Sequence, residues 1–170
     1  MSAHKPLEGV KVVELASFVA APTAGRMMAE MGADVIRVES TAGDPWRFYG
    51  ANCGLPITDE ENPLFDIYNL GKKDIQLNNQ DTGRERDFVP SLDEADVFIT
   101  NNRLKSLVRS GLDYESLKDR FPKLIYGLVT GYGQTGPDVD APGYDGVAFF
   151  SRSGMLADMA EPSGYPASAP

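Results

Sequence analysis

The chain has 170 residues, of which 42% are hydrophobic and 24% charged, as is typical of a soluble globular domain with its own core. The net charge of −9 argues against a nucleic-acid partner, because phosphate backbones bind basic surfaces. No apolar run approaches the roughly 18 residues of a membrane span, and no secretory signal is visible. Cys53 is the only cysteine, which excludes an internal disulfide and fits a cytoplasmic protein.

Apolar runs rich in β-branched residues alternate with helix-like segments along the chain. Strands are expected at residues 10–15, 34–39, 74–78, 96–100 and 124–130. Helices are expected at residues 22–31, 82–93, 103–109, 114–120 and 146–157, and residues 41–63, rich in glycine and proline, are expected to be irregular. This alternation predicts an α/β fold with a Rossmann-like, mostly parallel sheet flanked by helices.

The residue types available restrict the chemistry. His4 is the only histidine and lies near the amino terminus, so a Ser-His or Cys-His nucleophile pair and a histidine metal site are both disfavoured. One cysteine cannot form a structural zinc site. Residues 16–25, after the first strand, lack the Gly-x-Gly-x-x-Gly pattern of dinucleotide binding, which argues against an NAD-dependent oxidoreductase. We therefore expect neither a metal nor NAD.

Several charged residues lie where strands end or helices begin. Arg37 lies within the second strand, and Arg103 and Arg109 follow the fourth. Arginines at such places suit an anionic ligand, whereas the alternative is that they are solvated surface charges. Asp145, in a Gly-Tyr-Asp-Gly sequence, is the best-placed carboxylate, although a helix N-cap explains it more simply than catalysis.

Short motifs stand in a fixed order along the chain: PLEGVKVVEL from Pro6, AAP from Ala20, MGADVIRVE from Met31, NLGKK from Asn69, EADVFITN from Glu94, PKLIY from Pro122, GYGQTGP from Gly131 and PGYD from Pro142. This set resembles the class III CoA-transferases, the family of formyl-CoA transferase and α-methylacyl-CoA racemase. The resemblance runs from about Pro6 to the end of the chain. ENPLF, from Glu61, is similar to the branch that acts on 2-hydroxy or aryl acids.

The resemblance implies that CoA lies against the carboxyl edge of one CoA-binding domain, residues 1–170. The residues implied are Val19 and Ala20 in the cleft, Leu77 at the adenine, Asn101, Asn102 and Arg109 at the phosphates, and Tyr144 and Asp145 at the thioester end. Racemases carry a histidine base in place of Tyr144, so transfer is favoured. Ser40 stands where some relatives carry a CoA-contacting arginine, and Gln80 where many carry lysine, and we expect Arg37 and Arg103 to compensate.

The resemblance also implies how the whole enzyme works. An aspartate following a Gly-Asp pair attacks the acyl-CoA and forms an aspartyl-CoA thioester, from which a second carboxylic acid takes the CoA. That aspartate is expected a few residues beyond Pro170. We therefore expect the chain to be the amino-terminal part of a two-domain enzyme that forms an interlocked homodimer, and to be inactive alone. The alternatives are an acyl-CoA racemase of the same family and a non-catalytic CoA-binding fragment.

Overall fold

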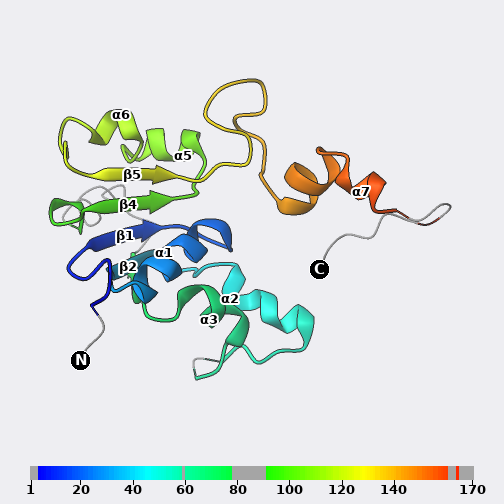
Figure 1. Ribbon diagram of the computed structural model, residues 1–170, viewed down its shortest axis with the longest axis horizontal. Helices are drawn as coiled ribbons and strands as arrows, with labels where there is room; N and C mark the ends of the chain where they lie inside the picture. Colours follow the sequence, from blue (N-terminus) through cyan, green and yellow to red (C-terminus); the bar gives the residue numbers. More distant parts are fainter. Residues whose placement is uncertain (1–3, 59, 78–90, 161–163, 165–170) are drawn as a thin grey trace. The chain divides into compact units, whose positions relative to one another are not determined.

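The structure is a computed structural model that describes residues 4–58, 60–77, 91–160 and 164. Its described residues form one parallel sheet in the order β3-β2-β1-β4-β5 (Figure 1). The strands are β1 (Lys11–Leu15), β2 (Asp34–Ser40), β3 (Lys73–Leu77), β4 (Val97–Thr100) and β5 (Ile125–Leu128). The predicted α/β fold with a parallel sheet is confirmed.

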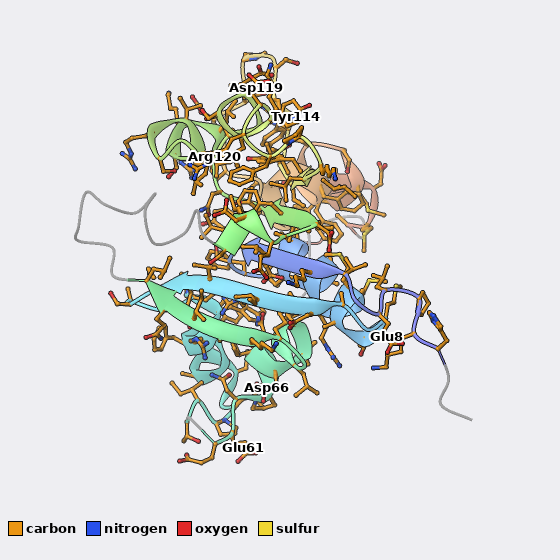
Figure 2. All side chains as sticks on the ribbon, turned by 90° about the vertical axis from the view of Figure 1, so that its left-hand side faces the viewer. Glu8, Glu61, Asp66, Tyr114, Asp119 and Arg120 are labelled. Carbon is orange, nitrogen blue, oxygen red and sulfur yellow. The ribbon has the colours of Figure 1, made fainter. Side chains whose placement is uncertain are left out.

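Successive strand residues point to opposite sides of the sheet, and a cluster of apolar side chains packs on each side. Val12 packs with Val35 and Ile99 against α1 (Ala20–Glu30). The next residue, Val13, faces the other way and packs in a cluster with residues of α5 (Leu104–Arg109) and α6 (Tyr114–Leu117). The charged side chains labelled in Figure 2, such as Glu8, Asp66 and Asp119, are exposed.

The region predicted to be irregular contains two short helices, which corrects that expectation. These are α2 (Trp46–Tyr49) and the 3-10 helix η1 (Gly50–Cys53); α3 (Pro63–Asn69) follows. Pro45 favours the start of α2 because its ring fixes a helical φ, here −52°. The Asp44 carboxylate then accepts a hydrogen bond from the Trp46 N–H. The helix predicted at 82–93 lies largely outside the described residues.

The chain divides into two compact units, of which the sheet unit comprises Met1–Asn102 and Ser106–Val129. The second comprises Arg103–Lys105 and Thr130–Pro170 and contains the π-helix η2 (Gly146–Ser151) and α7 (Met155–Asp158). The single helix predicted at 146–157 is therefore wrong. Gly154, with φ of 82°, interrupts it in a left-handed conformation that an α-helix cannot include.

The second unit depends on a close crossing of its own main chain. A Cβ atom on Gly143 would lie 2.5 Å from the Gly131 Cα and 2.9 Å from its nitrogen. Both positions therefore require glycine. No helix in the described part of the chain has the length and apolar character that a membrane crossing requires.

Candidate functional site

A cavity of about 380 Å³ lies at the carboxyl edge of the sheet. Its walls come from the ends of β1, β2 and β3, from the loop after β2, and from α5 with its flanking residues. β1 and β4 are neighbours here, and the chain continues from them toward opposite edges of the sheet. Open α/β sheets bind ligands at such a switch point. The volume lies within the roughly 300–1,000 Å³ of small-molecule sites.

Two of the predicted ligand residues line this cavity. Leu77 ends β3, and Asn102 follows β4. Ser40 lines it too. Asn101 instead uses its amide within the protein: Oδ1 accepts from the Ser17 N–H at 3.0 Å, and Nδ2 donates to the Ser17 carbonyl at 2.7 Å. Asn101 thus fixes the turn after β1.

The other predicted residues lie outside the cavity lining. Val19 caps α1, where its carbonyl accepts from the Thr23 N–H at 2.8 Å, and Ala20 is exposed at the first position of that helix. Arg109, the last residue of α5, is exposed. A direct CoA contact by Val19, Ala20 or Arg109 stays a prediction.

Tyr144, Asp145 and Arg103 belong to the second unit and are exposed there. The Asp145 carboxylate accepts from the Gly146 N–H at 2.8 Å, at the start of η2. The capping role that the sequence favoured for Asp145 is therefore confirmed. The roles of Tyr144 and Asp145 at a thioester stay predictions, as does a phosphate contact by Arg103.

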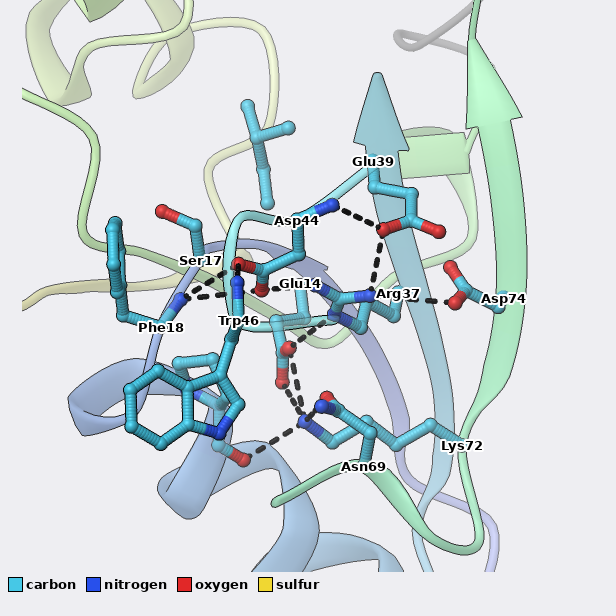
Figure 3. Close-up of polar contacts among 12 residues, drawn as sticks. Glu14, Ser17, Phe18, Arg37, Glu39, Asp44, Trp46, Asn69, Lys72 and Asp74 are labelled. Atoms are coloured by element: carbon cyan, nitrogen blue, oxygen red, sulfur yellow. Dashed lines mark hydrogen bonds and ion pairs between the residues drawn. The ribbon is translucent and has the colours of Figure 1, made fainter. Parts of the chain in front are cut away.

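Arg37 is not available to a phosphate, which corrects the expectation that it binds CoA or compensates for Ser40. Its side chain is 0% exposed and lies among carboxylates (Figure 3). Nη2 binds Asp44 Oδ2 at 2.5 Å, and Nη1 binds Glu39 at 3.1 Å and Asp74 at 3.3 Å. Nε lies 3.5 Å from Glu14 Oε1. The guanidinium is a structural counter-ion.

Lys72 extends the same buried cluster to α1. Its Nζ donates to both Glu14 carboxylate oxygens, at 3.0 and 2.8 Å, and to the Pro22 carbonyl and Asn69 Oδ1. Burial nevertheless raises the pKa of Glu14 to about 7, and burial lowers the pKa of Lys72. Gly25 gives the Glu14 carboxylate room, because a Cβ there would overlap it.

The electrostatics of the cavity favour an uncharged polar group. Glu39 and Asp44 line it, and both are bound to arginine. Burial raises the pKa of Glu39, but hydrogen bonds from Arg47 and the Arg37 charge outweigh it, so that the pKa is lowered. Among the described lining residues there is no lysine or arginine. A nucleoside fits such walls better than a phosphate, whose charge would meet two carboxylates.

The sequence interpretation missed Asp44 and two serines of the cavity wall, Ser106 and Ser110. Gly43-Asp44-Pro45 is a turn signal, and aspartate before proline often binds nearby main-chain N–H groups, so Asp44 could have been recognised. Ser106 and Ser110 are four residues apart, a spacing that places them on one side of α5 and the turn after it. Only the fold, which places the connection between β4 and β5 beside the cavity, identifies them as cavity residues.

The parallel sheet, with a cavity at its strand ends, defines a Rossmann-like α/β protein. Residues 7–170 match the model of CoA-transferase family III, and the chain belongs to that family. It is 48% identical over 158 residues to cinnamoyl-CoA:phenyllactate CoA-transferase of Clostridium sporogenes, covering 93% of this chain and 38% of that protein. It is 41% identical over 161 residues to (R)-2-hydroxy-4-methylpentanoate CoA-transferase of Clostridioides difficile, covering 95% and 40%.

A solved structure has the same fold. A CAIB/BAIF family protein from Brucella suis superposes with a TM-score of 0.85 at 38% identity, covering 98% of this chain and 44% of that one. The chain thus spans about 40% of the length of these curated relatives.

Proposed function

We propose that the protein transfers CoA from an acyl-CoA to a carboxylic acid and that this chain carries its CoA-binding sheet. The cavity at the carboxyl edge is the observation that carries the proposal, because its position and volume suit part of a nucleotide. Family membership supports the reaction type. The adenosine part of CoA would lie against Leu77 and Asn102, with its phosphates outside the acidic wall, toward Arg109.

The acceptor that we propose is a 2-hydroxy acid with an apolar side chain. Two relatives, at 48% and 41% identity, are a phenyllactate and a 2-hydroxy-4-methylpentanoate CoA-transferase, and both of these acids fit that description. We assign Tyr144 and Asp145, which are exposed in the second unit, to the thioester end.

The proposed mechanism uses an aspartate located beyond Pro170 as nucleophile. Its carboxylate would attack the thioester carbonyl, releasing CoA thiolate and leaving a mixed anhydride. The thiolate would then attack the aspartyl carbonyl, which releases the first acid and forms aspartyl-CoA. The acceptor carboxylate repeats these two steps in reverse order and leaves with the CoA. Each step exchanges one acyl bond, and no oxidant or metal is consumed.

The cavity assignment is tested by filling it in the intact protein. Ser106→Phe places a ring in the cavity, whereas Val108→Phe places one on the outside of the same helix, where Val108 is 58% exposed. We expect Ser106→Phe to weaken CoA binding at least tenfold in calorimetric titration and Val108→Phe to change it less than twofold. Equal affinities would refute the assignment of this cavity to CoA.

The reaction is tested by mass spectrometry of the intact protein with cinnamoyl-CoA and phenyllactate. We expect phenyllactyl-CoA in solution and a CoA thioester on the protein. With a 2-methyl-branched acyl-CoA, whose α-carbon is saturated, exchange of the α-proton for deuterium without transfer would indicate the racemase instead. CoA binding with neither reaction would indicate a binding protein.

A further inference from the structure

Asp44 joins two loops at the cavity. Its carboxylate accepts from the Phe18 N–H, at 3.2 Å to each oxygen, and from the Trp46 N–H at 2.9 Å. The Asp44 N–H itself donates to Glu39 Oε2 at 2.9 Å. Figure 3 shows this carboxylate between the turn after β1 and the start of α2. One buried residue, 3% exposed, therefore ties the two loops together.

Arg37 gives this buried carboxylate its counter-ion. The 2.5 Å contact between Arg37 Nη2 and Asp44 Oδ2 is fully enclosed, since both side chains are 1% exposed or less. A charge removed from water is tolerated when it is paired and its remaining acceptor sites are used, and both conditions hold at Asp44. Hydrogen bonds from main-chain N–H groups to a paired carboxylate are also stronger than those to a neutral oxygen.

The turn that Asp44 holds is strained. Phe18 has a φ of 62°, in the left-handed region that a bulky residue without glycine's freedom rarely adopts. Such a conformation persists only when its surroundings hold it. Asp44 holds the Phe18 N–H, and Asn101 holds both main-chain groups of Ser17. Ser17 lines the cavity, and the two residues after Phe18 are those implied in the CoA cleft.

We propose that Asp44 is a positioning residue for CoA binding, a role that rests on the proposed function. Paired with Arg37, it holds the Ser17–Phe18 turn in the left-handed conformation that shapes the cavity wall. Its carboxylate oxygens are engaged within the protein, so it acts through the turn. Loss of Asp44 releases Phe18 toward ordinary backbone conformations and moves the wall of the cavity.

Asp44→Asn and Asp74→Asn form a matched pair for the test. Each removes one carboxylate charge from Arg37, but the Asp74 carboxylate pairs with Arg37 and Arg47, whereas the Asp44 carboxylate also binds the turn through the Phe18 N–H. We expect Asp44→Asn to speed amide hydrogen exchange at Phe18 at least tenfold without ligand and to weaken CoA binding at least tenfold. Asp74→Asn should change both less than twofold. Thermal unfolding measures the stability lost in each variant.

A third variant separates the effect of the Asp44 charge from the effect of the position of its carboxylate. Asp44→Glu keeps the charge next to Arg37 but displaces the carboxylate by one methylene, so we expect it to fold and still to show faster exchange at Phe18 with weaker CoA binding. CoA affinity that falls only in proportion to lost stability, in both Asn variants alike, would overturn the proposal. Unchanged CoA affinity despite faster exchange at Phe18 would overturn it too.

Failure of the proposed function gives a different result. If the unaltered protein does not bind CoA, the proposed function is wrong, and with it the ligand part of this role. Amide hydrogen exchange at Phe18 is measured without ligand, so it still tests whether Asp44 stabilises the conformation of the turn.

Discussion

Replacing Arg37 with methionine removes the counter-ion from the buried cluster while keeping a side chain of similar length. Glu39, Asp44 and Asp74 each lose a charge-assisted hydrogen bond to the guanidinium. Removing one partner of a buried ion pair costs about 3–5 kcal/mol, because the remaining charge stays buried. With three carboxylates affected, we expect a loss of at least about 4 kcal/mol from a total that is typically about 5–15 kcal/mol.

Urea denaturation measures this loss, and the protein contains a built-in probe. Trp46 is the only tryptophan. Its main-chain N–H binds Asp44 and its indole N–H donates to the Leu64 carbonyl, so its fluorescence reports on the structure next to the cluster. Arg47→Met is the matched control. Arg47 also binds Glu39 and Asp74, but its side chain is 29% exposed, and we expect a loss of about 1–2 kcal/mol.

The loss should also depend on pH in a defined direction. The Arg37 charge lowers the pKa values of Glu14, Glu39 and Asp74, so without it these pKa values rise and the folded variant takes up protons that relieve the uncompensated charge. The deficit of Arg37→Met should therefore shrink as the pH is lowered. A deficit below about 1 kcal/mol, or one independent of pH, would refute the assignment of Arg37 as a structural counter-ion.

Two further predictions concern Glu14 and the glycine crossing. The pKa of Glu14, about 7 when folded, lies above its ordinary value of 4.5, so the folded state binds the extra proton. Its contribution to the free energy of unfolding is therefore lost as pH rises from about 4.5 to about 7, by up to about 3 kcal/mol. Glu14→Gln should abolish this pH-dependent contribution, as measured by urea titrations at several pH values. Gly143→Ala should destabilise the crossing at Gly131 by about 1–3 kcal/mol, seen as faster hydrogen exchange in residues 130–145. Gly146→Ala, whose Cβ would meet nothing within 4 Å, should leave that exchange unchanged.

Local patterns predicted much of the sheet. The run from Val10 to Leu15 became β1, and Asp34–Ser40 extends the predicted second strand by one residue. These runs suffice to predict strands because β-branched side chains favour strands. They contain apolar residues pointing to both faces, as expected of a sheet buried on both faces. The prediction of one helix at 146–157 was wrong because Gly154 breaks it. Whether a glycine within an apolar segment continues or ends a helix depends on its surroundings, which the local sequence does not show.

The cavity could be placed at the carboxyl edge from the order of elements, but its lining could not. Leu77 and Asn102 were identified through the family resemblance and do line it. Ser106 and Ser110 were not identified, because nothing local distinguishes a serine facing a cavity from one facing solvent. Asp44 carried a turn signal, yet its tie to Phe18 spans 26 residues of sequence.

By itself, the sequence determined the fold class, the order of the strands along the chain and the family resemblance, since each depends on local composition or on short motifs. Only the tertiary structure decided what Arg37 does. An arginine within a strand reads as a surface charge until the neighbouring strands are aligned. The register places Glu14 beside Arg37 on one side and Asp74 beside it on the other, and these partners lie 23 and 37 positions away in sequence. Strand pairing is a long-range choice, so the charge environment of a buried side chain exists only after the sheet has formed.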